Sequence, residues 1–197
     1  METITIVLIG AVAVLIFWAV GAYNRLIRLK NTIANAFGQI DVQLRRRYDL
    51  IPNLVEAAKK YLSHERETLK AVISARNQAK SASDAARAKP TNALAVTTLT
   101  VAEEALSSSL GQLFALNEAY PDLKGDQTIQ ALSEELTSTE NKVTFARQAF
   151  NDAVLDYNNA QGQFPAMLIA KLFSFAPSAM LQATQSAEKR STVRIAL

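Results

Sequence analysis

The longest uninterrupted run of hydrophobic positions lies at the N-terminus. From Ile4 to Ala22, nineteen residues follow one another without a charge, and Thr5 is the one polar side chain among them. A helix of about twenty apolar residues crosses the roughly 30 Å hydrocarbon core of a bilayer, where the backbone must be helical to satisfy its own polar groups. The pattern predicts a transmembrane helix over residues 4–22, after a short extracytoplasmic N-terminus at residues 1–3. A cleaved signal peptide is the alternative, although no basic residue precedes the run.

Basic residues follow the apolar run. They are Arg25, Arg28 and Lys30, and then Arg45, Arg46 and Arg47. Positive charge near the end of a span tends to remain cytoplasmic. We therefore expect a single-pass protein with its N-terminus outside and residues 23–197 in the cytoplasm.

Large apolar residues recur every seven positions in the last third of the chain, and smaller residues lie three positions after most of them. The large ones are Ile129, Leu136, Val143, Phe150, Tyr157 and Phe164, and the smaller ones are Leu132, Thr139, Ala146, Ala153 and Ala160. This heptad pattern is typical of a long helix that packs closely against partner helices. We expect it to begin at Asp126 or Gln127 and to be closed by Pro165.

A second helix is predicted over residues 91–119. Its apolar stripe consists of Leu99, Ala102, Leu106, Leu110, Leu113 and Tyr120. Pro121 and Gly125 interrupt the helical pattern between this helix and the next, which indicates the turn of a helical hairpin at residues 120–126. Residues 81–90 are rich in Ser, Ala and Lys and have no apolar stripe, so they read as an exposed loop.

The segment after the apolar run carries a nearly continuous stripe that Pro52 interrupts. The stripe consists of Ile33, Phe37, Ile40, Leu44, Ile51, Leu54, Val55, Ala58, Tyr61, Leu62, Leu69 and Val72. A proline inside a helix removes one hydrogen bond and crowds the preceding turn. Either the helix kinks and continues as one rod, which the unbroken stripe favours, or it stops near Tyr48 and restarts with Asp49 as its N-cap. The break gives helices of similar length, and we adopt it.

These elements predict an all-α protein in which the transmembrane helix continues into an antiparallel up-and-down bundle over residues 23–164. The bundle has four helices with the break at Pro52, or three with a single kinked rod. An apolar C-terminal segment at residues 165–182 either covers the open end of the bundle or lies on a bilayer or a partner. Residues 183–197 are polar and are predicted to be flexible.

Composition limits the chemistry that the chain can carry. The sequence has no cysteine and one histidine, His64, and its net charge is only +3 with acids and bases interspersed. One histidine without cysteine supplies too few ligands for the usual zinc sites. The chain also has no stretch of basic residues interleaved with aromatic residues, the pattern that would indicate nucleic-acid binding. We expect no catalytic residue, no cofactor, no metal, no nucleic-acid partner and no small-molecule substrate, and hence no enzyme.

Polar residues do lie on or beside the apolar stripes. They are Gln39, Asp41, Arg47, Asp49 and Asn53 in the first part of the chain, and Glu140, Asn141, Arg147 and Asn151 in the last. Glu140 and Arg147 are two turns apart on one face and flank Val143. Buried polar groups must be paired and can fix the register of a bundle. The residues are interpreted as structural, with a partner-binding surface as the alternative.

Three long motifs resemble one known family. They are GQIDVQLRRRYDLIPNLVEAAKKYLSHE at 38–65, AYPDLKG at 119–125 and TENKVTFARQAFNDAVLDYNNAQGQFP at 139–165. Together with the N-terminal span they resemble the LemA family of bacterial membrane-anchored proteins. The resemblance implies a helical bundle behind one span in the bacterial inner membrane, without an established enzymatic activity. It also implies two contexts, since family genes often lie beside those of HtpX-type membrane metalloproteases and a relative takes part in building magnetosome membranes.

The expected function is that of a non-enzymatic, membrane-anchored scaffold or adaptor. Its expected partners are the lipid bilayer, further copies of the chain and other proteins. The alternatives are a regulator or substrate adaptor of an HtpX-type membrane protease, and an oligomeric membrane-shaping protein.

Overall fold

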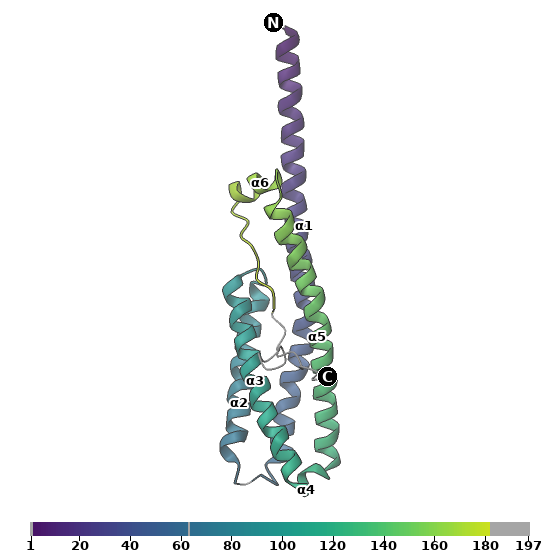
Figure 1. Cartoon of the computed structure of the whole chain (residues 1–197), viewed down its shortest axis with the longest axis vertical. Coiled ribbons are helices and arrows are strands. Elements are labelled where there is room, and N and C mark those ends of the chain that lie inside the picture. The colour runs from purple at the N-terminus through teal and green to yellow at the C-terminus, as the bar shows by residue number, and fades with distance from the viewer. Residues whose placement is uncertain (1, 63, 182–197) are drawn as a thin grey trace, which may run out of the picture.

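The computed structural model describes residues 2–62 and 64–181, and within them the chain is helical throughout, with short turns and one extended segment (Figure 1). This confirms the all-α bundle. The helices are α1 (Glu2–Ala58), α2 (Arg66–Ala88), α3 (Ala93–Ala119), α4 (Pro121–Lys124), α5 (Gln127–Gly162) and α6 (Ala166–Leu172). The four long helices alternate in direction, α5 packs along α1, and α2 packs against α3 and α1. The polar tail predicted at residues 183–197 lies outside the described residues.

Helix α1 extends well beyond its partners, so that its first part stands alone (Figure 1). It is the helix in the described chain that is long and apolar enough to cross a membrane, and its most apolar stretch is not buried against the protein. Burial begins at Leu26, which is 1% exposed, and continues at Ile33 and Phe37. The phenyl rings of Phe37 and Phe150 meet edge to face, with centroids 5.8 Å apart, where α1 packs on α5. One helix therefore passes from the exposed apolar stretch into the bundle core without a linker.

Pro52 lies inside α1 without ending it, so the break predicted at Asp49 is wrong. Pro52 has no N–H to donate to the carbonyl oxygen of Tyr48, four residues earlier. Arg76 of α2 supplies the missing donor, since its Nε lies 2.8 Å from the Tyr48 carbonyl oxygen. A bond from the neighbouring helix thus offsets the main cost of the proline, and sequence spacing within α1 gives no sign of it.

The chain turns ten residues after the predicted break. Helix α1 ends at Ala58, and residues 59–65 lead to α2. The single long rod is therefore also wrong, because the apolar stripe continues across two antiparallel helices. The hydroxyl of Tyr61 in this turn donates to the Asp126 carboxylate at 2.9 Å, which ties the turn to the start of α5.

The loop predicted at residues 81–90 is also wrong, because α2 remains helical to Ala88. Its buried face here is made of small side chains, Ala79, Ala82, Ser83 and Ala86. Small residues allow close approach of the neighbouring helices, but they leave no large-residue stripe in the sequence. Only a short turn separates α2 from α3, where the Asn92 side chain caps α3 by accepting from the N–H of Ala95 at 3.0 Å.

The heptad helix is confirmed as α5, with Asp126 as its N-cap. The Asp126 carboxylate accepts from the N–H groups of Thr128 and Ile129 at 2.8 and 3.1 Å. The Ile129 N–H, followed by the Tyr61 hydroxyl, holds the pKa of Asp126 below its usual range. The large heptad residues are buried as far as Tyr157. Phe164 is the exception at 79% exposed, because α5 ends at Gly162 before this position is reached.

The C-terminal segment has two parts. Helix α6 lies beside α1 and α5 at the end of the bundle from which the apolar stretch emerges (Figure 1). After a turn that includes Ser174, the chain runs back along the bundle as an extended strap, residues 175–181. The strap ends at Leu181, which is 2% exposed and belongs to the main core. The segment thus covers part of the bundle, and the interpretation that it also lies on a bilayer or a partner stays a prediction.

Candidate functional site

A buried polar network occupies the middle of the bundle, with Arg47 of α1 at its centre. Arg47 is 4% exposed. Its Nη1 donates to Glu103 Oε2 at 2.8 Å, and its Nη2 donates to the Ser107 hydroxyl at 3.0 Å. The same Nη1 lies 2.9 Å from Glu140 Oε2, an ion pair without hydrogen-bond alignment. One guanidinium therefore joins α1 to α3 and α5.

Glu103 of α3 is the most deeply buried acid in the network, at 1% exposed. Besides Arg47, it accepts a hydrogen bond from the Tyr48 hydroxyl, and Nη2 of Arg147 lies 3.8 Å from its carboxylate. Burial, and secondly the negative charge of Glu103, raises the pKa of Tyr48 far above its usual value. The phenol therefore stays protonated and donates.

The network is balanced in charge, since two guanidinium groups face two carboxylates. A buried charge is tolerated when it is paired and hydrogen-bonded, and each of these four groups has a partner of opposite sign. The geometry accordingly supports a structural role, in which the network fixes the relative positions of α1, α3 and α5.

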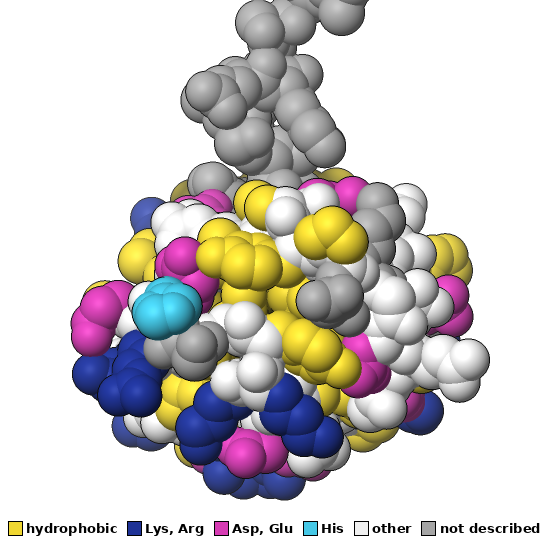
Figure 2. Space-filling model, turned by 90° about the horizontal axis from the view of Figure 1, so that it is seen from below, with side chains coloured by type: hydrophobic (Ala, Val, Ile, Leu, Met, Phe, Trp, Pro, Cys, Tyr) yellow, Lys and Arg dark blue, Asp and Glu magenta, His cyan; other side chains and the backbone are white. Residues whose placement is uncertain are grey.

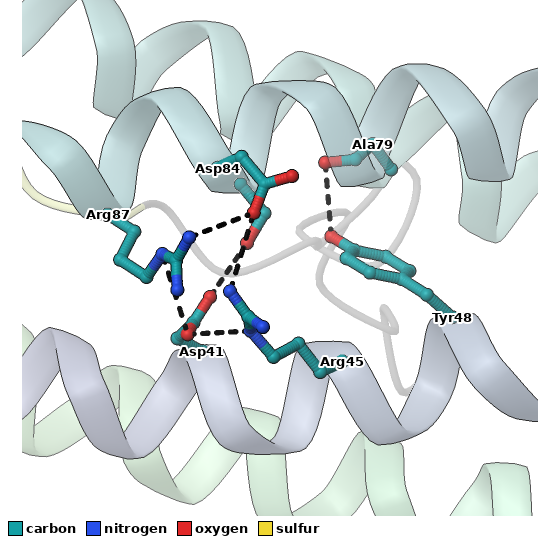
Figure 3. Close-up of polar contacts among 7 residues, drawn as sticks. Asp41, Arg45, Tyr48, Ala79, Asp84 and Arg87 are labelled. Atoms are coloured by element: carbon teal, nitrogen blue, oxygen red, sulfur yellow. Dashed lines mark hydrogen bonds and ion pairs between the residues drawn. The ribbon is translucent and has the colours of Figure 1, made fainter.

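A second cluster joins α1 to α2 around Asp41 (Figure 3). Asp41 accepts from Arg45 Nε at 2.9 Å and from the Ser83 hydroxyl at 3.5 Å, and Arg87 Nε lies 4.0 Å away. Asp84 lies on the outer side of the same cluster and pairs with Arg45 and Arg87 at 3.4 and 3.5 Å. Because this cluster is partly open to water, we assign it less stabilisation than the buried network.

The structure divides the nine polar residues that the sequence singled out. Asp41, Arg47, Glu140 and Arg147 belong to the two networks, although Glu140 and Arg147 turn toward other helices and not toward each other. Gln39 and Asn141 are exposed and line a groove between α1 and α5, with a volume of about 560 Å³. Asp49 and Asn53 are exposed on α1, with Asp49 3.8 Å from Arg76 Nη2.

Asn151, the ninth residue, holds the strap. Its amide donates to the carbonyl of Leu181 and accepts from the Leu181 N–H, both at 2.9 Å. Asn158, which the sequence analysis did not single out, makes the same pair of bonds with Ser178, both at 2.9 Å. Seven helical residues rise about 10.5 Å and three extended residues span about 10 Å, so the two asparagines match the strap in register.

A cavity of about 310 Å³ opens between α3 and α5 beside the buried network. Arg47, Ser107 and Glu140 lie along it, and apolar side chains such as Leu110 and Phe114 form much of the remaining wall. Its charged groups already pair with one another, and the Ser107 hydroxyl accepts a hydrogen bond from Arg47. Within residues 2–62 and 64–181, no three His, Cys, Asp or Glu side chains are close enough together to hold a metal ion.

The end of the bundle opposite the exposed apolar stretch of α1 has an apolar centre with Lys and Arg along one edge (Figure 2). The single histidine of the chain, His64, is exposed there. A groove of about 830 Å³ extends from this end between α1 and α2. Its apolar walls include Val55, Leu69 and Ile73, and its charged edge includes Lys59 and Lys70.

Comparison with known proteins connects this architecture to one family. A comparison with curated proteins gives no significant match. The family model described as "LemA family" matches residues 36–196, which include most of the bundle part of α1, all the later helices and the strap. The match covers most of the sequence and includes all three motifs, and we conclude that the chain belongs to the LemA family.

Proposed function

We propose that this protein is a non-enzymatic scaffold, anchored in the bacterial inner membrane, that presents a rigid helical bundle to other proteins and to further copies of itself. One observation carries the proposal: the exposed apolar stretch and the bundle core belong to the same uninterrupted helix. A membrane-tethered enzyme tolerates a flexible linker between its anchor and its domain. A scaffold, in contrast, gains when the bundle is held at a fixed distance from the membrane and in a fixed orientation.

The continuous helix determines how far the bundle reaches. From Tyr23 to Ala58, α1 has thirty-six residues, a rise of about 54 Å at 1.5 Å per residue. The groove between α1 and α2 lies at the end of this reach, where its apolar walls and charged edge fit an amphipathic partner helix. Basic residues at the base of the bundle, among them Arg25 and Arg28, support an orientation with the bundle in the cytoplasm.

The α1–α5 face supports self-association. Phe145 of α5 is 78% exposed and Val42 of α1 is 60% exposed. The pairs Phe37–Phe150 and Arg47–Glu140 set the antiparallel register, and the same register places Val42 beside Phe145. Large exposed apolar side chains on one face favour a contact with a second copy, and a two-fold contact is the commonest arrangement of such copies.

The proposal is tested by photo-crosslinking of the full chain in native membranes. A photoreactive residue is placed at Phe145 on the α1–α5 face, at Lys70 on the α1–α2 groove, or at the exposed Gln112 of α3 as a control. We expect an adduct of twice the monomer mass from position 145 and an adduct with another protein from position 70. Adducts no stronger than those of the control, together with a monomer mass by light scattering in detergent, would overturn the proposal.

The identity of the captured protein also separates the alternatives. A membrane metalloprotease captured from position 70 would assign the regulator role. Deformation of liposomes by the purified protein would assign the membrane-shaping role.

A further inference from the structure

The side of the bundle from which the apolar stretch emerges carries a second apolar feature, at α6. The ring of Tyr23 lies 4.8 Å from that of Phe173 and 5.6 Å from that of Phe175, both edge to face. Tyr23 directly follows the apolar run that ends at Ala22. These ring contacts therefore hold the end of α6 at the level where the apolar run ends.

Helix α6 has two apolar faces, and only one of them is covered. Ile169 and Ala170 are buried, and Ala170 packs in a small cluster with Leu26 and Ala160. Leu168 and Leu172 are four residues apart on the other face and are 53% and 73% exposed. Phe164 and Phe173, which flank the helix, are 79% and 54% exposed. Four large apolar side chains that remain more than half exposed at this point, Phe164, Leu168, Leu172 and Phe173, require a cover.

The charges around these four side chains are all positive. Arg25, Arg28, Lys30 and Lys171 are exposed, and no Asp or Glu occurs at residues 21–31 or 163–181. Basic side chains beside a membrane span are attracted to anionic lipid headgroups. The composition therefore matches that of an interfacial helix, with apolar side chains toward the acyl chains and cations among the headgroups.

The dimensions agree. Nineteen helical residues rise about 28 Å, close to the roughly 30 Å of the hydrocarbon core, beyond which each headgroup layer adds about 5–8 Å. With the apolar run in the core, Tyr23 lies at its edge, and the contacting ring of Phe173 lies within the headgroup layer. Interfacial helices are buried about 5–10 Å into this boundary.

We propose that residues 164–173 form a second membrane contact, in which Phe164, Leu168, Leu172 and Phe173 enter the same bilayer leaflet that α1 leaves. This inference rests on the proposed membrane anchor. A single span leaves the bundle free to rotate about the axis of α1, whereas a second contact beside it fixes which face of the bundle lies over the lipid. The bilayer is the occupant that the geometry selects, since a second copy would have to approach within the headgroup layer.

The test uses tryptophan fluorescence in proteoliposomes that contain phosphatidylglycerol and spin-labelled lipids as quenchers. Trp18 is the single tryptophan of the chain and reports on the anchor. A Trp18→Phe background carrying Leu172→Trp reports on α6. The same background carrying Phe145→Trp is the control, because Phe145 is as exposed as Leu172 but lies in the middle of the bundle. Circular dichroism establishes that each variant is folded.

The quenching of Trp18 tests the membrane anchor, and the quenching of the tryptophan in Leu172→Trp tests the second contact. We expect lipids labelled near the headgroup to quench both Trp18 and the tryptophan of Leu172→Trp strongly, and that of Phe145→Trp only weakly. An unquenched Trp18 would overturn the anchor itself. A quenched Trp18 with Leu172→Trp no more quenched than the control would overturn the second contact alone, whether water or a second copy covers α6.

Discussion

The Nε of Arg76 donates to the carbonyl oxygen of Tyr48 at 2.8 Å and takes the place of the N–H that Pro52 lacks. A side chain of α2 thus completes the hydrogen bonding of α1 at its proline. The bond also attaches the second helix to the first near the middle of the bundle. It explains why a proline within α1 coexists with an unbroken helix.

We predict that the value of this bond depends on Pro52. Arg76→Met leaves a partly buried carbonyl unpaired, at a cost of about 1–3 kcal/mol in the free energy of unfolding. In a Pro52→Ala background the N–H of residue 52 pairs with the same carbonyl, so Arg76→Met should cost less. Urea unfolding of the two single variants and the double variant in detergent measures the difference. If Arg76→Met lowers the free energy of unfolding equally in both backgrounds, Arg76 does not replace the N–H that Pro52 lacks.

The buried network predicts a large loss when Arg47 is removed. Arg47→Met leaves Glu103 and Glu140 without their shared cation, and breaking a buried pair costs about 3–5 kcal/mol. Arg46 is the matched control, because its guanidinium pairs with Glu135 at the surface, where the two side chains are 57% and 37% exposed. Arg46→Met should cost less than about 1 kcal/mol. Similar melting temperatures for the two variants would sink the structural interpretation of the network.

The raised pKa of Tyr48 predicts that the folded protein loses stability at high pH. Its pKa is raised in the folded protein, first by burial and second by Glu103, so above about pH 10 the unfolded chain loses a proton that the folded chain keeps. The stabilising contribution of the protonated Tyr48 phenol is fully present below pH 10. Above pH 10 the free energy of unfolding falls by about 1.4 kcal/mol per pH unit.

The comparison that isolates this effect is Tyr48→Phe. Tyr157, whose pKa burial also raises, is present in both proteins, so its contribution cancels in the comparison. Unfolding measured between pH 8 and 11 should therefore show a steeper decline in the original chain than in the variant above pH 10. Parallel profiles would mean that Tyr48 titrates as it does in water.

Asn151 and Asn158 each make two hydrogen bonds to the backbone of the strap, and we predict that these bonds hold it in place. Asn158→Ala removes both hydrogen bonds to the backbone of Ser178, so the amide of Ser178 should exchange with deuterium faster, by roughly fivefold for each kcal/mol of lost protection. Asn159→Ala is the control, since Asn159 is exposed on the same helix. Hydrogen exchange followed by mass spectrometry measures both, and unchanged protection of the segment around Ser178 in Asn158→Ala would show that packing alone holds it.

Much of the fold follows from the spacing of large apolar residues. The heptads of α5 and the stripe of α3 were predicted on this basis, and the packing of these helices needs little else. Where the buried face is made of alanine and serine, as at Ala82 and Ala86, the same reasoning fails. Small residues pack as closely as large ones, but they do not stand out from an exposed alanine-rich loop.

The site was predictable in part. Arg47 and Arg147 were identified because each lies on or beside an apolar stripe. Glu103 was missed because Ala102 was assigned to the stripe of α3, although Val96, Leu99, Glu103, Leu106, Leu110 and Leu113 follow an alternating spacing of three and four residues. That spacing is the signal that marks Glu103 as buried. The donor that compensates Pro52 lies on another helix, and no pattern within α1 reveals it.

The central claim is that one rigid helix carries the bundle out of the membrane, and a spin-label scan tests it most directly. The chain has no cysteine, so single cysteines at residues 14–30 can be labelled one at a time in proteoliposomes. The account predicts lipid-accessible labels up to Ala22, then immobilised labels at buried positions such as Leu26, with helical periodicity and no mobile site between. A run of mobile, water-accessible labels between residues 20 and 26 would contradict it.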